Sequence, residues 1–321
     1  MKKALITGIS GQDGSYLAYH LIGKGYKVYG SSRDIKSNDF FRLKALNIIN
    51  KVHLVSMSTT NFADVFEVVS RVRPDEIYNL AGQSSVGMSF QYPMECEKSI
   101  VGGVMNLLES VRKINPLIRL YNAGSSEMFG DTGTTIADES HPFNPVSPYG
   151  VSKSSSFMHV KNYRDTYGLS VCSGILGNHD SALRGDEFVT QKIVQGAKDI
   201  RKGRKNRIKL GNLNTTRDWG YAVEYVEAMH LMLLKEEPED FIICTGSSYS
   251  LRDFAKEIFR ANGLDLLEHL EIDQSLFRPN DIEITRLDSS KAKRLLGWSA
   301  SVDLKELVRI MTNGEILKNG K

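Results

Sequence analysis

The sequence predicts an α/β protein in which a doubly wound parallel sheet carries a smaller C-terminal lobe. Short apolar runs alternate with amphipathic stretches in the first half, a glycine-rich turn follows the first apolar run, and the alternation stops after about Gly174. Strands separated by helices form right-handed crossovers, which imply a parallel sheet covered on both faces. At 321 residues, the chain also exceeds the length at which one core usually stops growing.

The elements of the first half follow from hydrophobic periodicity along the chain. Short apolar runs predict strands, and longer stretches with apolar residues at helical spacing predict helices. The predicted strands are Lys3–Thr7, Tyr26–Ser31, Val52–Ser56, Glu76–Leu80 and Arg119–Asn122. The predicted helices are Tyr16–Lys24, Val65–Val72 and Val101–Lys113.

The second half differs in composition. Glycine, asparagine, arginine and histidine accumulate between 177 and 220, with a basic stretch at 201–209. Helical patterns return at Tyr221–Leu234, Leu251–Ala261 and Leu304–Lys318. We therefore expect a second lobe that is interleaved with the sheet domain.

Composition restricts the classes of function. The formal net charge of +3 is small for this length and argues against nucleic acid as the main partner. No apolar run reaches the roughly 18–20 residues that cross a bilayer, and the apolar stretch near the N-terminus is too short for a signal peptide. Cys96, Cys172 and Cys244 are far apart, so neither a disulfide framework nor a metal site is expected. These features fit a cytoplasmic protein without a membrane partner.

Three glycines lie where the first predicted strand passes into the first predicted helix. Gly8 permits the tight turn, Gly11 lets the backbone approach a pyrophosphate, and Gly14 lets the helix pack on the strand. The helix N-terminus then offers N–H groups and its positive dipole end to the phosphates. The GxxGxxG spacing resembles that of short-chain dehydrogenases, and a simple tight turn is the alternative. We expect a dinucleotide-binding domain over 1–176, to which 218–246 and 284–299 return, and a substrate lobe mainly over 177–321.

The second predicted strand runs into Ser31-Ser32-Arg33-Asp34. Small residues followed by arginine accommodate the 2′-phosphate of NADP, whereas an acidic residue at the strand end binds the ribose hydroxyls of NAD. Arg33 comes first and Asp34 lies beyond the expected strand tip, so the pattern favours NADP. NAD is one alternative, and two merely solvated charges are the other.

A second motif has the spacing Tyr-x-x-x-Lys, which places Tyr149 and Lys153 on one face of a helix. A lysine ammonium near a phenol favours the phenolate and so lowers its pKa toward that of a general base. Upstream, Ser125 follows a predicted strand at the edge where open α/β sheets bind ligands, and its hydroxyl can hold a substrate oxygen. Glu127 adds a second acid/base, unless it is only a surface acid on a loop.

In these motifs the sequence resembles the GDP-mannose 4,6-dehydratase family of extended short-chain dehydrogenases, over nearly its whole length. The resemblance implies a Rossmann-like sheet. The matching segments are GISGQDGSYLA (8–18), YNLAGQSSVGMSF (78–90), SSEMFG (125–130), SPYGVSK (147–153), GNHDSALRGDEFVTQKI (177–193), GNLNTTRDWGYAVEYVEAMHLML (211–233), FRPNDIE (277–283) and KAKRLLGW (291–298).

The resemblance also implies roles for individual residues. Tyr149 is the base and Lys153 its partner, Glu127 is the acid/base at C5 of a sugar, and Ser125 stands where the family usually has threonine. The implied cofactor residues are Gly8, Ser10, Gly11, Gln12, Asp13, Gly14, Ser32, Arg33, Leu80, Ala81, Tyr149, Lys153, Asn178 and Arg184. The implied substrate residues are Ser84, Ser85, Glu127, Asn178, Val189, Lys192, Gly211, Arg217, Arg278 and Asp281. Arginines suit a diphosphate, and Asp281 suits donors on ribose or guanine.

The sequence departs from the family pattern in three places. Arg33-Asp34-Ile35-Lys36 stands where the family usually has paired arginines, used for the NADP phosphate and at a tetramer contact. Val55-Ser56 replaces a Gly-Asp pair, and Ala81-Gly82-Gln83-Ser84 replaces Ala-Ala-Gln-Ser. These changes indicate a divergent relative, one that can act on a related GDP-sugar such as a GDP-heptose.

The implied reaction turns GDP-mannose, or a related GDP-sugar, into a 4-keto-6-deoxy product, with NADP as cofactor and NAD as the alternative. A homo-oligomer, dimer or tetramer, is expected through the helices Val101–Lys113 and Ser152–Thr166. The rival enzymes are a GDP-4-keto-6-deoxymannose reductase, which consumes its cofactor, and a 4-epimerase. A nucleotide-binding regulatory protein on an inactive scaffold is the rival from another class, and the intact set Ser125, Glu127, Tyr149 and Lys153 argues against it.

Overall fold

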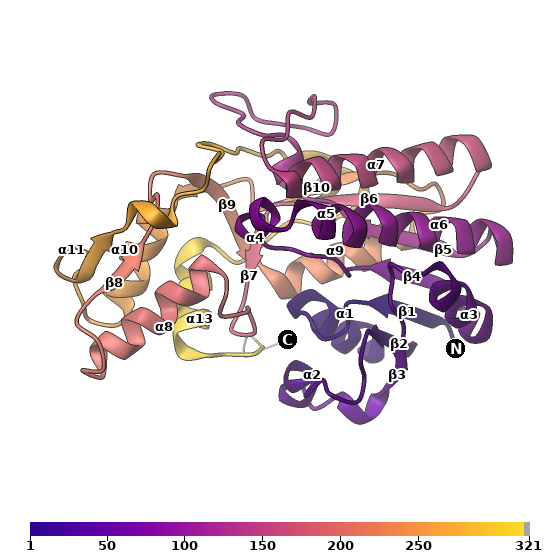
Figure 1. The fold of residues 1–321 in the computed structure, drawn as a ribbon, viewed down its shortest axis with the longest axis horizontal. Coiled ribbons are helices and arrows are strands. Elements are labelled where there is room, and N and C mark those ends of the chain that lie inside the picture. The colour runs from indigo at the N-terminus through magenta and orange to yellow at the C-terminus, as the bar shows by residue number, and fades with distance from the viewer. Residues whose placement is uncertain (318–321) are drawn as a thin grey trace.

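The computed structural model describes residues 1–317, and its centre is a seven-stranded sheet in the order β10-β6-β5-β4-β1-β2-β3 (Figure 1). Every pairing within this sheet is parallel. The prediction of a doubly wound parallel sheet is therefore confirmed. The strands are β1 (Lys3–Thr7), β2 (Lys27–Ser32), β3 (Val52–Ser56), β4 (Glu76–Asn79), β5 (Arg119–Ala123), β6 (Val171–Leu176) and β10 (Phe241–Ile243).

Helices cover both faces of the sheet. Neighbouring side chains along each strand point to opposite faces, so one strand contributes to two separate buried clusters. In β1, Ala4 and Ile6 belong to one buried cluster and Leu5 to another. The first cluster includes α1 (Gln12–Gly23) and α9 (Ala222–Leu234). The second includes α3 (Phe62–Val72), α6 (Gly103–Ile114) and α7 (Pro148–Tyr167). This layering leaves the carboxyl ends of the strands as the edge where a ligand can bind.

A smaller lobe lies beside that edge. Its core is a separate cluster, in which the Trp219 ring packs against Phe254 of α10. Buried side chains of α8 and α13 complete this cluster. The helices are α8 (Val189–Arg201), α10 (Leu251–Ala261) and α13 (Leu304–Asn313). Two small sheets, in the orders β11-β9-β7 and β12-β8, also belong to the lobe. Their strands are β7 (Asn178–Asp180), β8 (Ile208–Leu210), β9 (Thr216–Tyr221), β11 (Ser248–Ser250) and β12 (Leu270–Ile272).

The remaining elements are short. They are α2 (Phe41–Ala45), α4 (Val86–Gln91), α5 (Pro93–Glu97), the π-helical turn η2 (Lys98–Gly102), α11 (Leu266–His269), α12 (Ser290–Leu296) and the 3₁₀ turns η1 (Ile49–Lys51), η3 (Ser126–Met128) and η4 (Gln274–Leu276). Over residues 1–317, no helix is long and apolar enough to cross a membrane.

Some predicted boundaries are wrong for local reasons. The first helix begins at Gln12 rather than Tyr16, since the glycine turn passes directly into it. The helix predicted from Val101 begins at Gly103, after the π-helical turn. The last helix ends at Asn313 because Gly314 adopts a left-handed conformation with a φ of 71°, and the predicted end at Lys318 lies outside the described residues.

Candidate active site

The glycine turn has the shape that a pyrophosphate needs. Gly8 has a φ of 71°, and a Cβ there would lie 2.8 Å from the Leu80 carbonyl oxygen. A Cβ on Gly14 would overlap the Gly8 carbonyl oxygen. Gly11 stands at the N-cap of α1, and among the described residues no side chain caps this helix. The first N–H groups of α1 are therefore free of side-chain acceptors and suit an anion.

The second strand ends beside this turn. Ser32 closes β2, and the exposed Arg33 has no ion-pair partner within residues 1–317. The Asp34 carboxylate accepts hydrogen bonds from the backbone N–H groups of Lys36 (2.8 Å) and Ser37 (3.1 Å). Asp34 thus stabilises its own loop, and Arg33 is the free charged side chain at this position.

Gln12 and Asp13, expected at the cofactor, direct their side chains elsewhere. The Gln12 amide donates to the His179 carbonyl oxygen (3.2 Å), and Asp13 Oδ2 lies 2.9 Å from His179 Nε2. Both side chains therefore face β7, and only their backbone N–H groups remain for the turn. Arg184 lies beyond β7, where its Nε is 3.0 Å from Asp180 Oδ1.

The end of β5 and the start of α7 bring three proposed catalytic side chains together. Ser125 Oγ accepts from the Glu127 N–H (3.2 Å) and so caps η3. Gly150 packs so closely on this turn that a Cβ would lie 2.7 Å from the Glu127 carbonyl oxygen. Ser125, Glu127 and Tyr149 are each at most 9% exposed. Two segments distant in sequence thus form one buried site.

The Lys153 ammonium lies over the Tyr149 ring and bonds to the backbone of β5. Lys153 Nζ donates to the Ala123 carbonyl oxygen at 2.6 Å and lies 5.7 Å from the centre of the Tyr149 ring. Burial raises the pKa of Tyr149, while a hydrogen bond with Ser125 acts in the opposite direction. Burial also lowers the pKa of Lys153 to about 8. Burial is thus the largest influence on both groups, and the role of Lys153 as the partner of Tyr149 stays a prediction.

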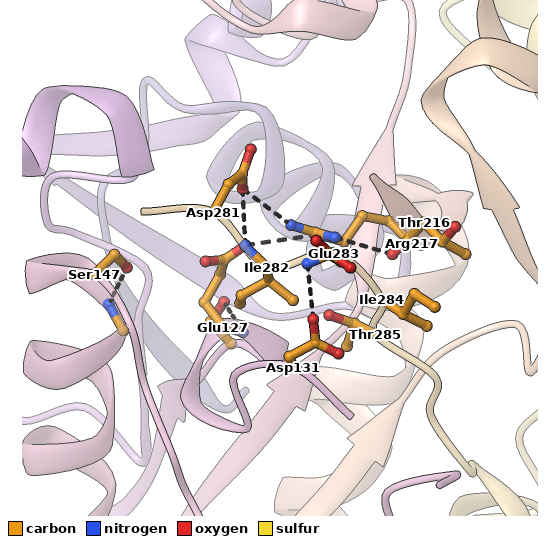
Figure 2. A network of polar contacts seen from close by, with 12 residues as sticks. Glu127, Asp131, Ser147, Thr216, Arg217, Asp281, Ile282, Glu283, Ile284 and Thr285 are labelled. Atoms are coloured by element: carbon orange, nitrogen blue, oxygen red, sulfur yellow. Dashed lines mark hydrogen bonds and ion pairs between the residues drawn. The ribbon is translucent and has the colours of Figure 1, made fainter. Parts of the chain in front are cut away.

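Arginine and carboxylate side chains complete the site (Figure 2). Arg217 on β9 is 5% exposed, and its Nε lies 3.7 Å from Glu127 Oε1. Its Nη2 lies 3.4 Å from Asp281 Oδ1, which also accepts from Arg278 Nη1 at 3.1 Å. Asp281, expected to meet ribose or guanine, thus holds both arginines. Burial lowers the pKa of Arg217, although Glu127 and Asp281 act against burial.

The other expected substrate residues surround this cluster less closely. Ser85 caps α4 next to Ser84, Asn178 opens β7, Val189 and Lys192 lie on α8, and Gly211 follows β8. Among the described residues, neither the Val189 nor the Lys192 side chain makes a polar contact with the cluster. A cavity of about 510 Å³ lies between α5 and the start of α7, and its lining includes Met94, Ser147, Ser152 and Asn280 but none of the expected catalytic residues.

Sequence analysis missed His179 and Asp218. His179 lies inside a recognised segment, but its partner Asp13 is 166 positions away, so no local pattern marks the pair. Asp218, buried on β9, accepts hydrogen bonds from Thr245 and Ser247 and fastens the lobe to the loop after β10. In the described part of the chain, no group of His, Cys, Asp and Glu side chains could hold a metal ion.

Comparison with known proteins decides the family. The family model for GDP-mannose 4,6 dehydratase matches residues 5–311. The chain belongs to the GDP-mannose 4,6-dehydratase family. GDP-mannose 4,6 dehydratase 1 of Arabidopsis thaliana is 41% identical over 98% of this chain and 90% of its own length. The family resemblance expected from the motifs is thereby confirmed.

Solved structures agree on the fold. The dTDP-glucose 4,6-dehydratase of Bacillus anthracis, in complex with NAD, has a TM-score of 0.85 at 20% identity and covers 98% of this chain and 96% of its own. RMD from Pseudomonas aeruginosa, complexed with NADPH, has a TM-score of 0.80 at 18% identity, with 98% coverage of both chains. At such identities, these likenesses establish the extended short-chain dehydrogenase fold alone.

Proposed function

We propose that this chain is a nucleotide-sugar 4,6-dehydratase that converts GDP-mannose, or a related GDP-sugar such as GDP-manno-heptose, to the 4-keto-6-deoxy product. The observation that carries the proposal is the buried Glu127, which shares one site with Tyr149 and Ser125. Oxidation or epimerisation at C4 needs a base there, whereas elimination across C5 and C6 needs a further acid/base. Glu127 supplies that further group.

The chain's own residues then divide the proton transfers. Tyr149, hydrogen-bonded with Ser125, takes the proton of the C4 hydroxyl. The C4 ketone acidifies the C5 hydrogen, so Glu127 removes the C5 proton and gives a proton to the departing C6 hydroxyl. Glu127 or Tyr149 later returns a proton to C5. Arg217, whose Nε lies 3.7 Å from Glu127 Oε1, holds the side chain that begins this exchange.

A nicotinamide cofactor, NADP by preference and NAD as the alternative, fits the turn between β1 and α1. Bound there, it would supply the transfer of a hydride from C4 to C6 without net reduction. The backbone of Ser10–Gly14 holds its pyrophosphate, Leu80 and Ala81 flank it, and Ser32 with Arg33 holds the 2′-phosphate. The engagement of Asp34 in its own loop supports NADP.

The GDP-sugar is held by the smaller lobe. Arg217 and Arg278 bind the diphosphate, with Asp281 orienting both guanidinium groups. The residues proposed to line the rest of the substrate are Ser84, Ser85, Asn178, Val189, Lys192 and Gly211. Residues 1–176, with 218–246 and 284–299, bind the cofactor in this scheme, and the rest of 177–321 mainly binds the sugar nucleotide. The enzyme acts as a homo-oligomer, dimer or tetramer, in the cytoplasm.

Incubation with GDP-mannose and, separately, with GDP-manno-heptose tests the proposal. One of the two should give a 4-keto product without net change in cofactor absorbance. A protein that consumes reduced cofactor stoichiometrically is instead a reductase, and one that gives only the C4 epimer is an epimerase.

A further inference from the structure

One ion pair joins the glycine turn to the smaller lobe. Asp13, in the first turn of α1, places Oδ2 2.9 Å from Nε2 of His179, the middle residue of β7. The adjacent Gln12 reinforces this contact, because its Nε2 donates to the His179 carbonyl oxygen and its Oε1 accepts from Ser181 Oγ at 2.7 Å. Two neighbouring side chains of the turn thus contact a single short segment.

The surroundings of the imidazole determine its charge. His179 Nδ1 lies 2.8 Å from the Gly177 carbonyl oxygen, and Nε2 faces the Asp13 carboxylate. A carbonyl oxygen and a carboxylate only accept hydrogen bonds, so both ring nitrogens must donate. A neutral imidazole donates from one nitrogen only, and its other lone pair would face an acceptor. The geometry therefore requires an imidazolium.

The charged and titratable groups around the ring have opposing effects. Burial alone lowers the pKa of His179, but the Asp13 charge and both hydrogen bonds outweigh it, and the net direction is upward. Arg184, whose Nη1 donates to the His179 carbonyl oxygen at 3.5 Å, lowers it again, and the Arg184 guanidinium is itself paired with Asp180 at 3.0 Å. Tyr225 stacks on the ring at 4.5 Å between centroids.

Asp13 responds as the partner of a cation. Burial raises the pKa of its carboxyl group, but the charge and hydrogen bond of His179 lower it to about 2. Beyond the stacked ring, the Tyr225 hydroxyl donates to Asp218 Oδ1 at 3.4 Å. Because the pKa of Asp13 is about 2, this carboxyl group is ionised at every pH near neutrality. His179 is the member of the pair that titrates.

We propose that His179 is a positioning residue whose imidazolium, paired with Asp13, fastens the cofactor-binding turn to β7, so that the turn loosens and cofactor retention falls when His179 loses its proton. This inference rests on the proposed binding of a nicotinamide dinucleotide at the turn. A dehydratase that regenerates its cofactor in every cycle gains from slow cofactor release, which such a contact provides.

The linkage has a definite sign. Loss of the proton removes one hydrogen bond and leaves a lone pair against an acceptor, so the contact is present at low pH and is lost as pH rises through the pKa of His179. By reciprocity, an anionic pyrophosphate on the turn raises the pH at which this loss occurs.

Two measurements on the full-length chain test the fastening itself, without any cofactor. ¹⁵N NMR of His179 should show both ring nitrogens protonated at about pH 7, and a neutral tautomer there would overturn the proposal. Amide hydrogen exchange of Gly8–Gly14, corrected for its intrinsic pH dependence, should accelerate roughly tenfold or more between about pH 6 and pH 9. In His179→Gln, which keeps a donor toward Asp13 but cannot titrate, the corrected exchange should not change with pH. An equal pH dependence in that variant would also overturn the proposal.

A third measurement tests retention. NADPH dissociation, followed by its fluorescence, should accelerate roughly tenfold over the same pH range in the unmodified chain and much less in His179→Gln. The matched control is His53→Gln on the exposed side of β3, which should keep the unmodified profile. A chain that binds neither NADPH nor NADH refutes the proposed cofactor, whereas a chain that binds NADPH with a pH-independent release rate refutes the role of His179.

Discussion

The Nε atom of Arg217 lies 3.7 Å from Oε1 of Glu127, so the guanidinium proposed for the substrate diphosphate is in ion-pair distance of the proposed C5 acid/base. The same guanidinium contacts Asp281 through Nη2. Anchoring of the nucleotide and proton transfer on the sugar therefore share a charged group. Because Arg217 is buried, its loss leaves Glu127 without its ion-pair partner and Asp281 with Arg278 alone, which is costly.

The first prediction concerns anchoring. Arg217→Ala and Arg278→Ala should each weaken GDP binding by about 2–4 kcal/mol, since each removes a charged hydrogen-bonding partner. Isothermal titration with GDP measures the loss, and Arg71→Ala on the exposed face of α3 is the control. An unchanged dissociation constant rules out the residue tested.

A second prediction isolates the elimination step. Glu127→Gln keeps the size and hydrogen bonding of the side chain but cannot accept the C5 proton. Dehydration should fall by at least ~10²–10⁴-fold, the usual contribution of general acid–base catalysis, and solvent deuterium exchange at C5 should fall with it. Substrate and cofactor affinity, measured in parallel, should persist. Turnover of the variant at the unmodified rate contradicts the assignment of Glu127.

Cofactor choice gives the third prediction. Arg33→Ala should lose affinity for NADP while keeping affinity for NAD, because the exposed guanidinium serves only the 2′-phosphate. Fluorescence titration with NADPH and NADH measures both affinities, and Lys36→Ala in the same loop is the matched control. Equal binding of the two cofactors before and after the change refutes the role of Arg33.

The fourth prediction concerns self-association through the helices that precede and contain Tyr149. Met94 on α5 and Met158 on α7 are exposed by 85% and 58%, so these helices offer apolar side chains that a second copy of the chain can cover. The chain should form at least dimers at micromolar concentration in light scattering. Met158→Glu should shift the population toward monomers, while Phe62→Glu on α3 should not. A strict monomer before any change defeats the prediction.

The fifth prediction is a loss of stability in acid. His20 Nε2 and His230 Nδ1 lie 3.0 Å apart, and one of these two nitrogens must be unprotonated to accept the bond. Burial, followed by the neighbouring charge of His230, lowers the pKa of His20 from 6.5 to about 4, and burial also lowers that of His230. The stability that the His20–His230 hydrogen bond contributes is complete above about pH 6.5, where both rings are neutral. It is lost as pH falls toward 4.

Thermal unfolding between about pH 7 and pH 5 tests this prediction. The melting temperature should fall with pH, and His20→Gln, which keeps a donor but does not titrate, should fall less steeply. The control His53→Gln should follow the unmodified chain. Equal slopes in all three proteins exclude the histidine pair as the cause.

Local patterns made much of this molecule predictable. Gly8, Gly11 and Gly14 act within one turn, and Tyr149 stands on a single helix, so short segments of sequence contain the information. The parallel sheet follows from the regular alternation of its strands and helices. The residues of the glycine turn and the catalytic segments could therefore be named before their contacts were known.

Contacts between remote segments were not predictable in this way. Asp13 on α1 pairs with His179 on β7, across the interface of the two lobes. Arg217 on β9 pairs with Glu127, which follows β5 of the large sheet. The Ala123 carbonyl that receives the Lys153 ammonium likewise belongs to another element, β5, 30 positions away. Burial, which decides the direction of these pKa shifts, arises only when the segments pack together.

The segment after Arg278 links the two halves of the site. Its backbone bonds to Thr216 on one side, through Glu283, and to Thr132 on the other, through Ile284, while Asp281 holds Arg217. During synthesis on the ribosome, this segment emerges after almost nine-tenths of the described chain. An incomplete nascent chain can therefore form the glycine turn but not the arginine–carboxylate cluster. The capacity to hold a nucleotide sugar should appear late in translation, after the glycine turn and the strands up to β10 have had time to fold.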